Sequence, residues 1–70
     1  MNADEIRGLL KAKPFKPFTV HRPDARAVRV DDPKYAMVTQ GGRFLFFCEE
    51  GDSFTRIDLT TVTHLEKEAA

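Results

Sequence analysis

Residues 18–30 read FTVHRPDARAVRV and give the clearest indication of the fold. Apolar and polar residues alternate on both sides of a turn at Pro23 and Asp24. A period of two is typical of a β-strand with one buried face, and proline followed by aspartate favours a turn. The stretch therefore predicts two antiparallel strands, with Val28 and Val30 pointing inward on the second.

The same period continues along the chain between short turn signals. Four further strands are expected, at 35–39, 44–49, 54–57 and, as a short last strand, 62–66. The glycine turn at 40–43 can host positive φ, and residues 58–61 are expected to form a one-turn link. This order predicts a mainly β (α+β) fold, in which five or six antiparallel strands over about 18–66 form one strongly bent sheet. In so short a chain, such a sheet closes into a partly open barrel of the SH3 or Sm-like kind.

A short amphipathic helix is expected before the sheet, over about 3–13. Asn2 is suited to cap its start. Three apolar residues form one stripe at helical spacing, namely Ile6, Leu9 and Leu10. Pro14 ends the helix, because the residue before a proline is driven out of the α region. The stripe is expected to pack across the sheet.

Length and composition limit the class of protein. The 70 residues are expected to form a single domain, 1–70. Cys48 is the only cysteine, so no disulfide forms within the chain, and its apolar neighbours favour a buried structural thiol. No apolar run approaches the roughly 20 residues that span a membrane, and the first ten residues carry no secretion signal. A reduced, cytoplasmic setting without membrane contact is therefore expected.

The formal net charge is zero, but the two halves of the chain differ. Residues 1–34 hold eight Lys and Arg against five acidic residues, whereas residues 35–70 hold three against six. Such polarity favours head-to-tail association or a basic face toward an acidic partner. It averages out, however, if both halves interleave in one sheet.

Residues that often carry chemistry are few and scattered. Cys48, His21 and His64 fall on three predicted strands, without the close spacing of a metal site. The carboxylate pairs at 31–32 and 49–50 end strands, where neighbouring side chains point to opposite faces. The only serine lies in a turn without a G-x-S-x-G motif, and no phosphate-loop pattern is present. We therefore expect a protein that is not an enzyme and that holds neither a cofactor nor a metal.

The run Phe44–Cys48 departs from the alternating pattern, because it is apolar on both faces of its strand. Either the strand bends through the centre of a small barrel, or another subunit covers its second face. Phe44, Phe46 and Phe47 are therefore the candidate self-association residues, and a symmetric homo-oligomer is the expected assembly. The first functional prediction is a self-associating binding or scaffold module.

Two other functions remain open. Small Sm-like barrels bind RNA through aromatic and basic side chains, and Arg26, Arg29 and Arg43 are the candidates for nucleic-acid contact. The neutral net charge and the absence of an aromatic RNA-binding signature argue against this function. The third candidate function is an accessory subunit of a larger complex, bound to a protein partner.

Five segments carry a resemblance, in the order 6–10 (IRGLL), 14–21 (PFKPFTVH), 31–33 (DDP), 41–43 (GGR) and 57–63 (IDLTTVT). Together they resemble a group of short uncharacterised bacterial proteins with a P-F-x-P-F-x-[VI]-H joint and an I-D-L-x-x-V-T ending. The resemblance covers nearly the whole chain. It implies the same fold and a bacterial origin, and it implies no activity. The chain departs from the group at Ala25, where glycine is common, and at Asp32, where a histidine often precedes the proline.

Overall fold

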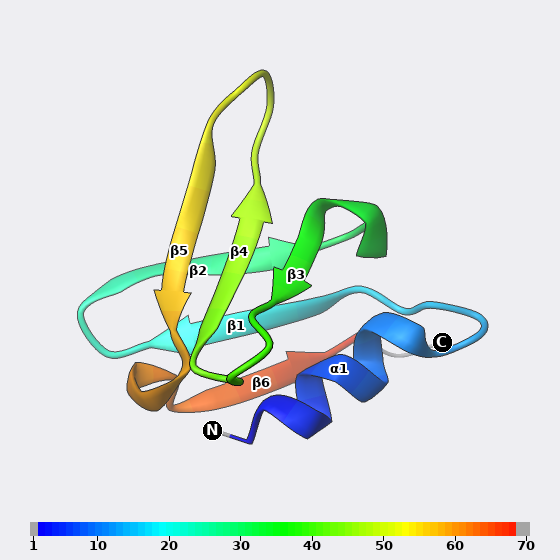
Figure 1. Ribbon diagram of the computed structural model, residues 1–70, viewed down its shortest axis with the longest axis horizontal. Helices are drawn as coiled ribbons and strands as arrows, with labels where there is room; N and C mark the ends of the chain where they lie inside the picture. Colours follow the sequence, from blue (N-terminus) through cyan, green and yellow to red (C-terminus); the bar gives the residue numbers. More distant parts are fainter. Residues whose placement is uncertain (1, 69–70) are drawn as a thin grey trace.

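The computed structural model describes residues 2–68 as one helix and two small β-sheets (Figure 1). The elements are α1 (Ala3–Lys11), β1 (Phe18–Arg22), β2 (Ala25–Val30), η1 (Pro33–Tyr35), β3 (Ala36–Val38), β4 (Phe44–Cys48), β5 (Phe54–Asp58), η2 (Leu59–Thr61) and β6 (His64–Lys67), where η marks a single 3₁₀ turn. The helix has nine residues, and no helix in residues 2–68 is long and apolar enough to cross a membrane.

The six strands form two three-stranded sheets, ordered β2-β1-β6 and β3-β4-β5. Every neighbouring pair is antiparallel. Figure 1 shows the strands of the second sheet running steeply across those of the first. The sheets do not close on each other, so the predicted mainly β fold with a partly open barrel is confirmed.

The core lies where the two sheets and the helix meet. Its buried residues come from all three parts: Ile6, Phe18, Val20, Val28, Val30, Leu45, Ile57, Leu59 and Val62. The inward placement of Val28 and Val30 is confirmed, since both are buried on β2. Across the two sheets, alternation along each strand directs one row of side chains into this core.

The helix is joined to the turn between β3 and β4 by specific contacts. The Arg7 guanidinium donates hydrogen bonds to the backbone oxygens of Thr39 (2.9 Å) and Gln40 (3.1 Å). Gly42 has φ +79°, and a Cβ built on it would lie 3.2 Å from the Ala3 Cβ. The predicted positive φ in this turn is therefore confirmed, and glycine also allows the helix to approach.

The ends of the helix follow local rules. The Asn2 side chain accepts a hydrogen bond from the Asp4 backbone N–H at 2.8 Å, which confirms the predicted cap. The helix ends at Lys11, two residues earlier than expected, and Ala12 is already extended. Because Pro14 disfavours the α conformation at Lys13, the helix cannot extend to residue 13 as expected.

Several strand boundaries differ from the sequence prediction by one or two residues, and two of these differences have a clear local cause. Tyr35, expected in a strand, belongs to η1, because Pro33 suits a helical first turn and the Asp32 carboxylate accepts from the Lys34 N–H at 2.9 Å. The last strand begins at His64 and not at Val62, whose N–H closes the predicted one-turn link η2.

Candidate binding surface

The two faces of β4 are distinguished by burial. Leu45 is fully buried, and Phe47 packs against the core from the same side of the strand. Phe44, Phe46 and Cys48 point to the opposite side, away from the core. Of the three predicted self-association residues, the structure places Phe44 and Phe46 together on the outer side and Phe47 on the inner side.

Strand pairing adds further apolar side chains to this outer side. Met37 lies opposite Phe46, and Cys48 lies opposite Phe54. The Phe46 and Phe54 rings are 5.7 Å apart between centroids. Met37 is 59% exposed, Phe54 62% and the neighbouring Tyr35 50%. We call this surface the outer face; its residues are Tyr35, Met37, Phe44, Phe46, Cys48 and Phe54.

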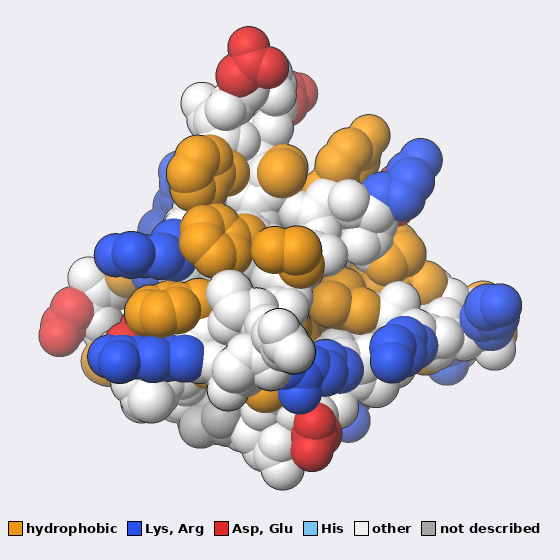
Figure 2. All heavy atoms as spheres, viewed as in Figure 1, with side chains coloured by type: hydrophobic (Ala, Val, Ile, Leu, Met, Phe, Trp, Pro, Cys, Tyr) orange, Lys and Arg blue, Asp and Glu red, His pale blue; other side chains and the backbone are white. Residues whose placement is uncertain are grey.

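The outer face is contiguous and slightly hollowed. Figure 2 shows hydrophobic side chains gathered over the β3-β4-β5 sheet. Among them runs a shallow groove of about 600 Å³, whose lining includes Tyr35, Met37, Phe46 and Phe54. Large apolar side chains that adjoin on a protein surface mark a place of association more often than isolated ones do.

Cationic side chains border one end of the outer face. The guanidinium carbons of Arg43 and Arg56 lie 5.2 Å and 5.1 Å from the centre of the Phe44 ring. Arg43 also donates to the Asp58 carboxylate at 3.2 Å. Hydrogen bonds from the Thr60 hydroxyl and N–H, with the Arg43 contact, hold the pKa of Asp58 below its usual value.

The other end of the outer face is acidic. Glu50 and Asp52 occupy the β4–β5 turn, which forms the red tip at the top of Figure 2. Within residues 2–68, neither of these carboxylates nor Arg56 takes part in an ion pair. The outer face is thus an apolar surface with unpaired charge of opposite sign at its two ends.

Cys48 lies on the outer face and is exposed, so the expected buried thiol is wrong. The apolar run around it suggested burial, but alternation along β4 turns Cys48 outward at the strand's last position.

The three candidate nucleic-acid residues come from both sheets. Arg26 and Arg29 lie on β2, whereas Arg43 precedes β4 in the other sheet. Each faces a carboxylate: Arg26 lies 3.6 Å from Glu49, and Arg43 contacts Asp58. Arg29 donates to Glu68 at 2.6 Å and 3.2 Å. These bonds lower the pKa of Glu68 and raise the pKa of Arg29.

The two histidines meet across β1 and β6. Their register brings His21 opposite His64, and the rings stack at 4.3 Å between centroids. The His21 Nε2 lies 3.0 Å from a Glu66 carboxylate oxygen. Cys48 lies in the other sheet, so the three residues do not converge. In residues 2–68, no three His, Cys, Asp or Glu side chains are grouped so as to hold a metal ion.

Sequence reasoning missed Met37, Phe54 and Arg56 as parts of the surface. The signal was present, because alternation from buried Ile57 places residues 54 and 56 outward. Their meeting with Phe46 depends on strand register, which was not predicted.

No known protein family, no curated protein and no solved structure matches this chain.

Proposed function

We propose that the protein is a self-associating binding or scaffold module, without catalytic activity, whose outer face packs on that of a second copy. The observation that carries the proposal is the exposure of Met37, Phe54 and Tyr35 beside Phe46 on one sheet face. Burial of one such side chain contributes about 1.5–3 kcal/mol. For a chain with so small a core, a dimer that buries several of them is stabilised considerably.

Charge supports a second copy as the occupant. Consider a face-to-face dimer whose two-fold axis lies in the interface, perpendicular to β4, and passes between Phe46 and Cys48. In this dimer the two copies of β4 are antiparallel. The Arg56 end of each outer face then lies over the acidic β4–β5 turn of the other. Both copies contribute the same contacts. Arg56 and the carboxylates of the β4–β5 turn, which have no ion-pair partner within residues 2–68, would then pair across the interface.

The test is the oligomeric state of the pure protein, measured by light scattering after size exclusion. We expect a mass near twice 8.0 kDa at micromolar concentration. Phe46→Asp should give a folded monomer, because the new carboxylate would be desolvated in the interface. Ala27→Asp is the matched control: it places the same charge on exposed β2 and should leave the dimer intact.

A charge exchange tests the antiparallel arrangement. Arg56→Glu should weaken the dimer by facing an acidic turn, and the double variant Arg56→Glu with Asp52→Arg should restore it. A wild-type monomer of 8.0 kDa at high protein concentration would contradict the proposal.

One observation favours the nucleic-acid function as a second candidate. The Phe44 ring lies close to two arginines on a surface rich in exposed rings, and rings of this kind can stack on unpaired bases. Titration with a short single-stranded RNA at physiological salt separates the candidates. The self-association proposal expects no binding tighter than about 10⁻⁴–10⁻⁶ M, the non-specific range.

A further inference from the structure

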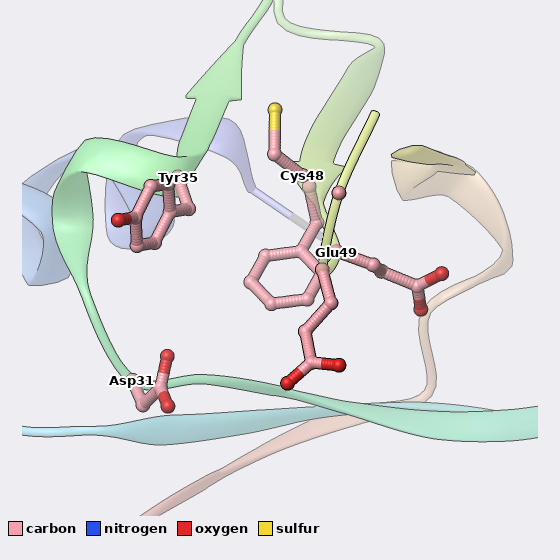
Figure 3. A pocket seen from close by; sticks show the side chains of 7 residues that line it. Asp31, Tyr35, Cys48 and Glu49 are labelled. Atoms are coloured by element: carbon pink, nitrogen blue, oxygen red, sulfur yellow. The ribbon is translucent and has the colours of Figure 1, made fainter. Parts of the chain in front are cut away.

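A second hollow adjoins the outer face, between the end of β2, η1 and the β4–β5 turn. Its volume is about 480 Å³, which falls within the range of small-ligand sites. Figure 3 shows Asp31 and Tyr35 on one side and Glu49 on the other, with the Cys48 sulfur turned away. Phe47, packed against the core from β4, also lines it.

The lining of this hollow combines negative charge with aromatic surface. Asp31, Glu49 and Glu50 contribute three carboxylates, and no lysine or arginine is among the lining residues. Tyr35 and Phe47 contribute two rings, whose faces attract cations through the ring quadrupole. The combination disfavours anions and is suited to an organic cation.

The two opposed carboxylates retain hydrogen-bonding capacity. In residues 2–68, the ion-pair partner of Glu49 is Arg26 at 3.6 Å, and that of Asp31 is Arg29 at 3.7 Å. Both distances are too long for a hydrogen bond, and the hydrogen bonds that Arg29 donates go to Glu68. Each carboxylate can therefore still accept from a donor placed in the hollow.

The protein's own cations show which chemistry the walls attract. Besides the two arginines, the Lys34 ammonium lies 5.8 Å from the centre of the Tyr35 ring. None of these three cations is among the residues that line the hollow, so each contacts its carboxylate or ring from outside the hollow. An ammonium or guanidinium inside the hollow would face the same two carboxylates and the same ring.

We propose that this hollow binds an organic cation, an alkylammonium or guanidinium group, held by Asp31 and Glu49 beside the Tyr35 ring. The cation comes either from a free amine or from a lysine or arginine side chain of another protein. Asp31, Glu49 and Phe47 lie off the outer face, whereas Tyr35 and Glu50 belong to surfaces that the proposed dimer would cover. Ligand binding and oligomeric state are therefore measured on the same samples.

The test is a titration of the isotope-labelled protein followed by NMR. The first probe is Nα-acetyl-lysine methylamide. The ligand control is Nα-acetyl-norleucine methylamide, which keeps the four side-chain carbons and lacks the ammonium group. We expect the lysine probe to shift the backbone signals of Asp31, Tyr35 and Glu49, and the norleucine probe to leave them unchanged. The same spectra report whether each variant remains folded.

Three variants assign the binding to the hollow. Glu49→Gln and Asp31→Asn should each weaken the lysine probe about tenfold, the effect of losing one charge-assisted hydrogen bond. Asp24→Asn, which removes an exposed carboxylate in the β1–β2 turn, should leave the affinity unchanged. A third probe, n-butylamine, distinguishes the source: equal affinity indicates a free amine, and clearly weaker affinity indicates a protein side chain.

Three results would overturn the proposal. The first is equal binding of the norleucine and lysine probes, and the second is an unchanged affinity for the lysine probe in both carboxylate variants. The third is the absence of any shift in the signals of Asp31, Tyr35 and Glu49 at about 10 mM lysine probe, because a dissociation constant above that concentration means no specific binding. The oligomeric state of the same samples, measured in parallel, keeps this outcome separate from that of the dimer.

Discussion

Replacement of Ile6 by alanine tests how far the helix contributes to the core. Ile6 is fully buried in α1, whereas Leu9 and Leu10 are half-buried and pack at its edge. Ile6→Ala removes three carbon groups, which costs about 2.5 kcal/mol in transfer from the core at about 0.8 kcal/mol each. The cavity left behind adds to this cost, and the observed range for such truncations is about 2–5 kcal/mol.

The consequence depends on the total stability of the domain. A chain of 70 residues is expected to unfold at a cost of about 3.5–10 kcal/mol, from the usual value per residue. Ile6→Ala therefore removes a large part of the stability and can unfold the protein at 37 °C. Ile6→Val, with an expected cost of about 0.5–1.5 kcal/mol, gives a measurable variant if the alanine variant does not fold.

Urea denaturation followed by circular dichroism measures these changes. Leu9→Ala should cost less than Ile6→Ala, because part of the Leu9 side chain already contacts water. Lys11→Ala, on the exposed side of the helix, should be nearly neutral. A smaller cost for Ile6→Ala than for Leu9→Ala would show that the helix does not enter the core through Ile6.

Two further predictions concern the β3–β4 turn and the C-terminal end of β5. Gly42→Ala should cost at least about 1 kcal/mol, from positive φ and from the close approach of Ala3; a midpoint equal to wild type in urea would contradict it. Asp58 has a lowered pKa in the folded state, so its contribution is present at neutral pH and is lost as the pH falls from the ordinary value through the lowered one. Asp58→Asn should therefore reduce the loss of stability between about pH 5 and pH 2, measured by urea titration at each pH. If this variant loses as much stability in acid as the wild type, the loss comes from other carboxylates.

Much of the fold could be read from local sequence. Alternation located β1 and β2 and directed Val28 and Val30 inward, because a strand with one buried face needs that period. Asn2 as a cap and Gly42 at positive φ were likewise predictable, since both depend on a few consecutive residues. The sequence also contained the signal for η1, a proline after an aspartate, although we expected a strand at Tyr35.

Which face of β4 enters the core depends on contacts with the neighbouring strands. Residues 44–48 are apolar on both sides, so their own pattern carries no preference. Pairing with β5 sets Leu45 opposite Ile57, and both side chains are buried in the core. This arrangement leaves Phe46 outside beside Met37 and Phe54, and turns Cys48 outward with them.

Both candidate sites depend on contacts between residues distant in the chain. Asp31 and Glu49 face one hollow only because the two sheets cross, and no local pattern connects the ends of β2 and β4. Short-range periodicity and turn chemistry were therefore enough to predict the order of the helix and strands and the inward direction of Val28 and Val30. Register and sheet crossing decided which side chains meet on the surface, because they arise from the packing of the whole core.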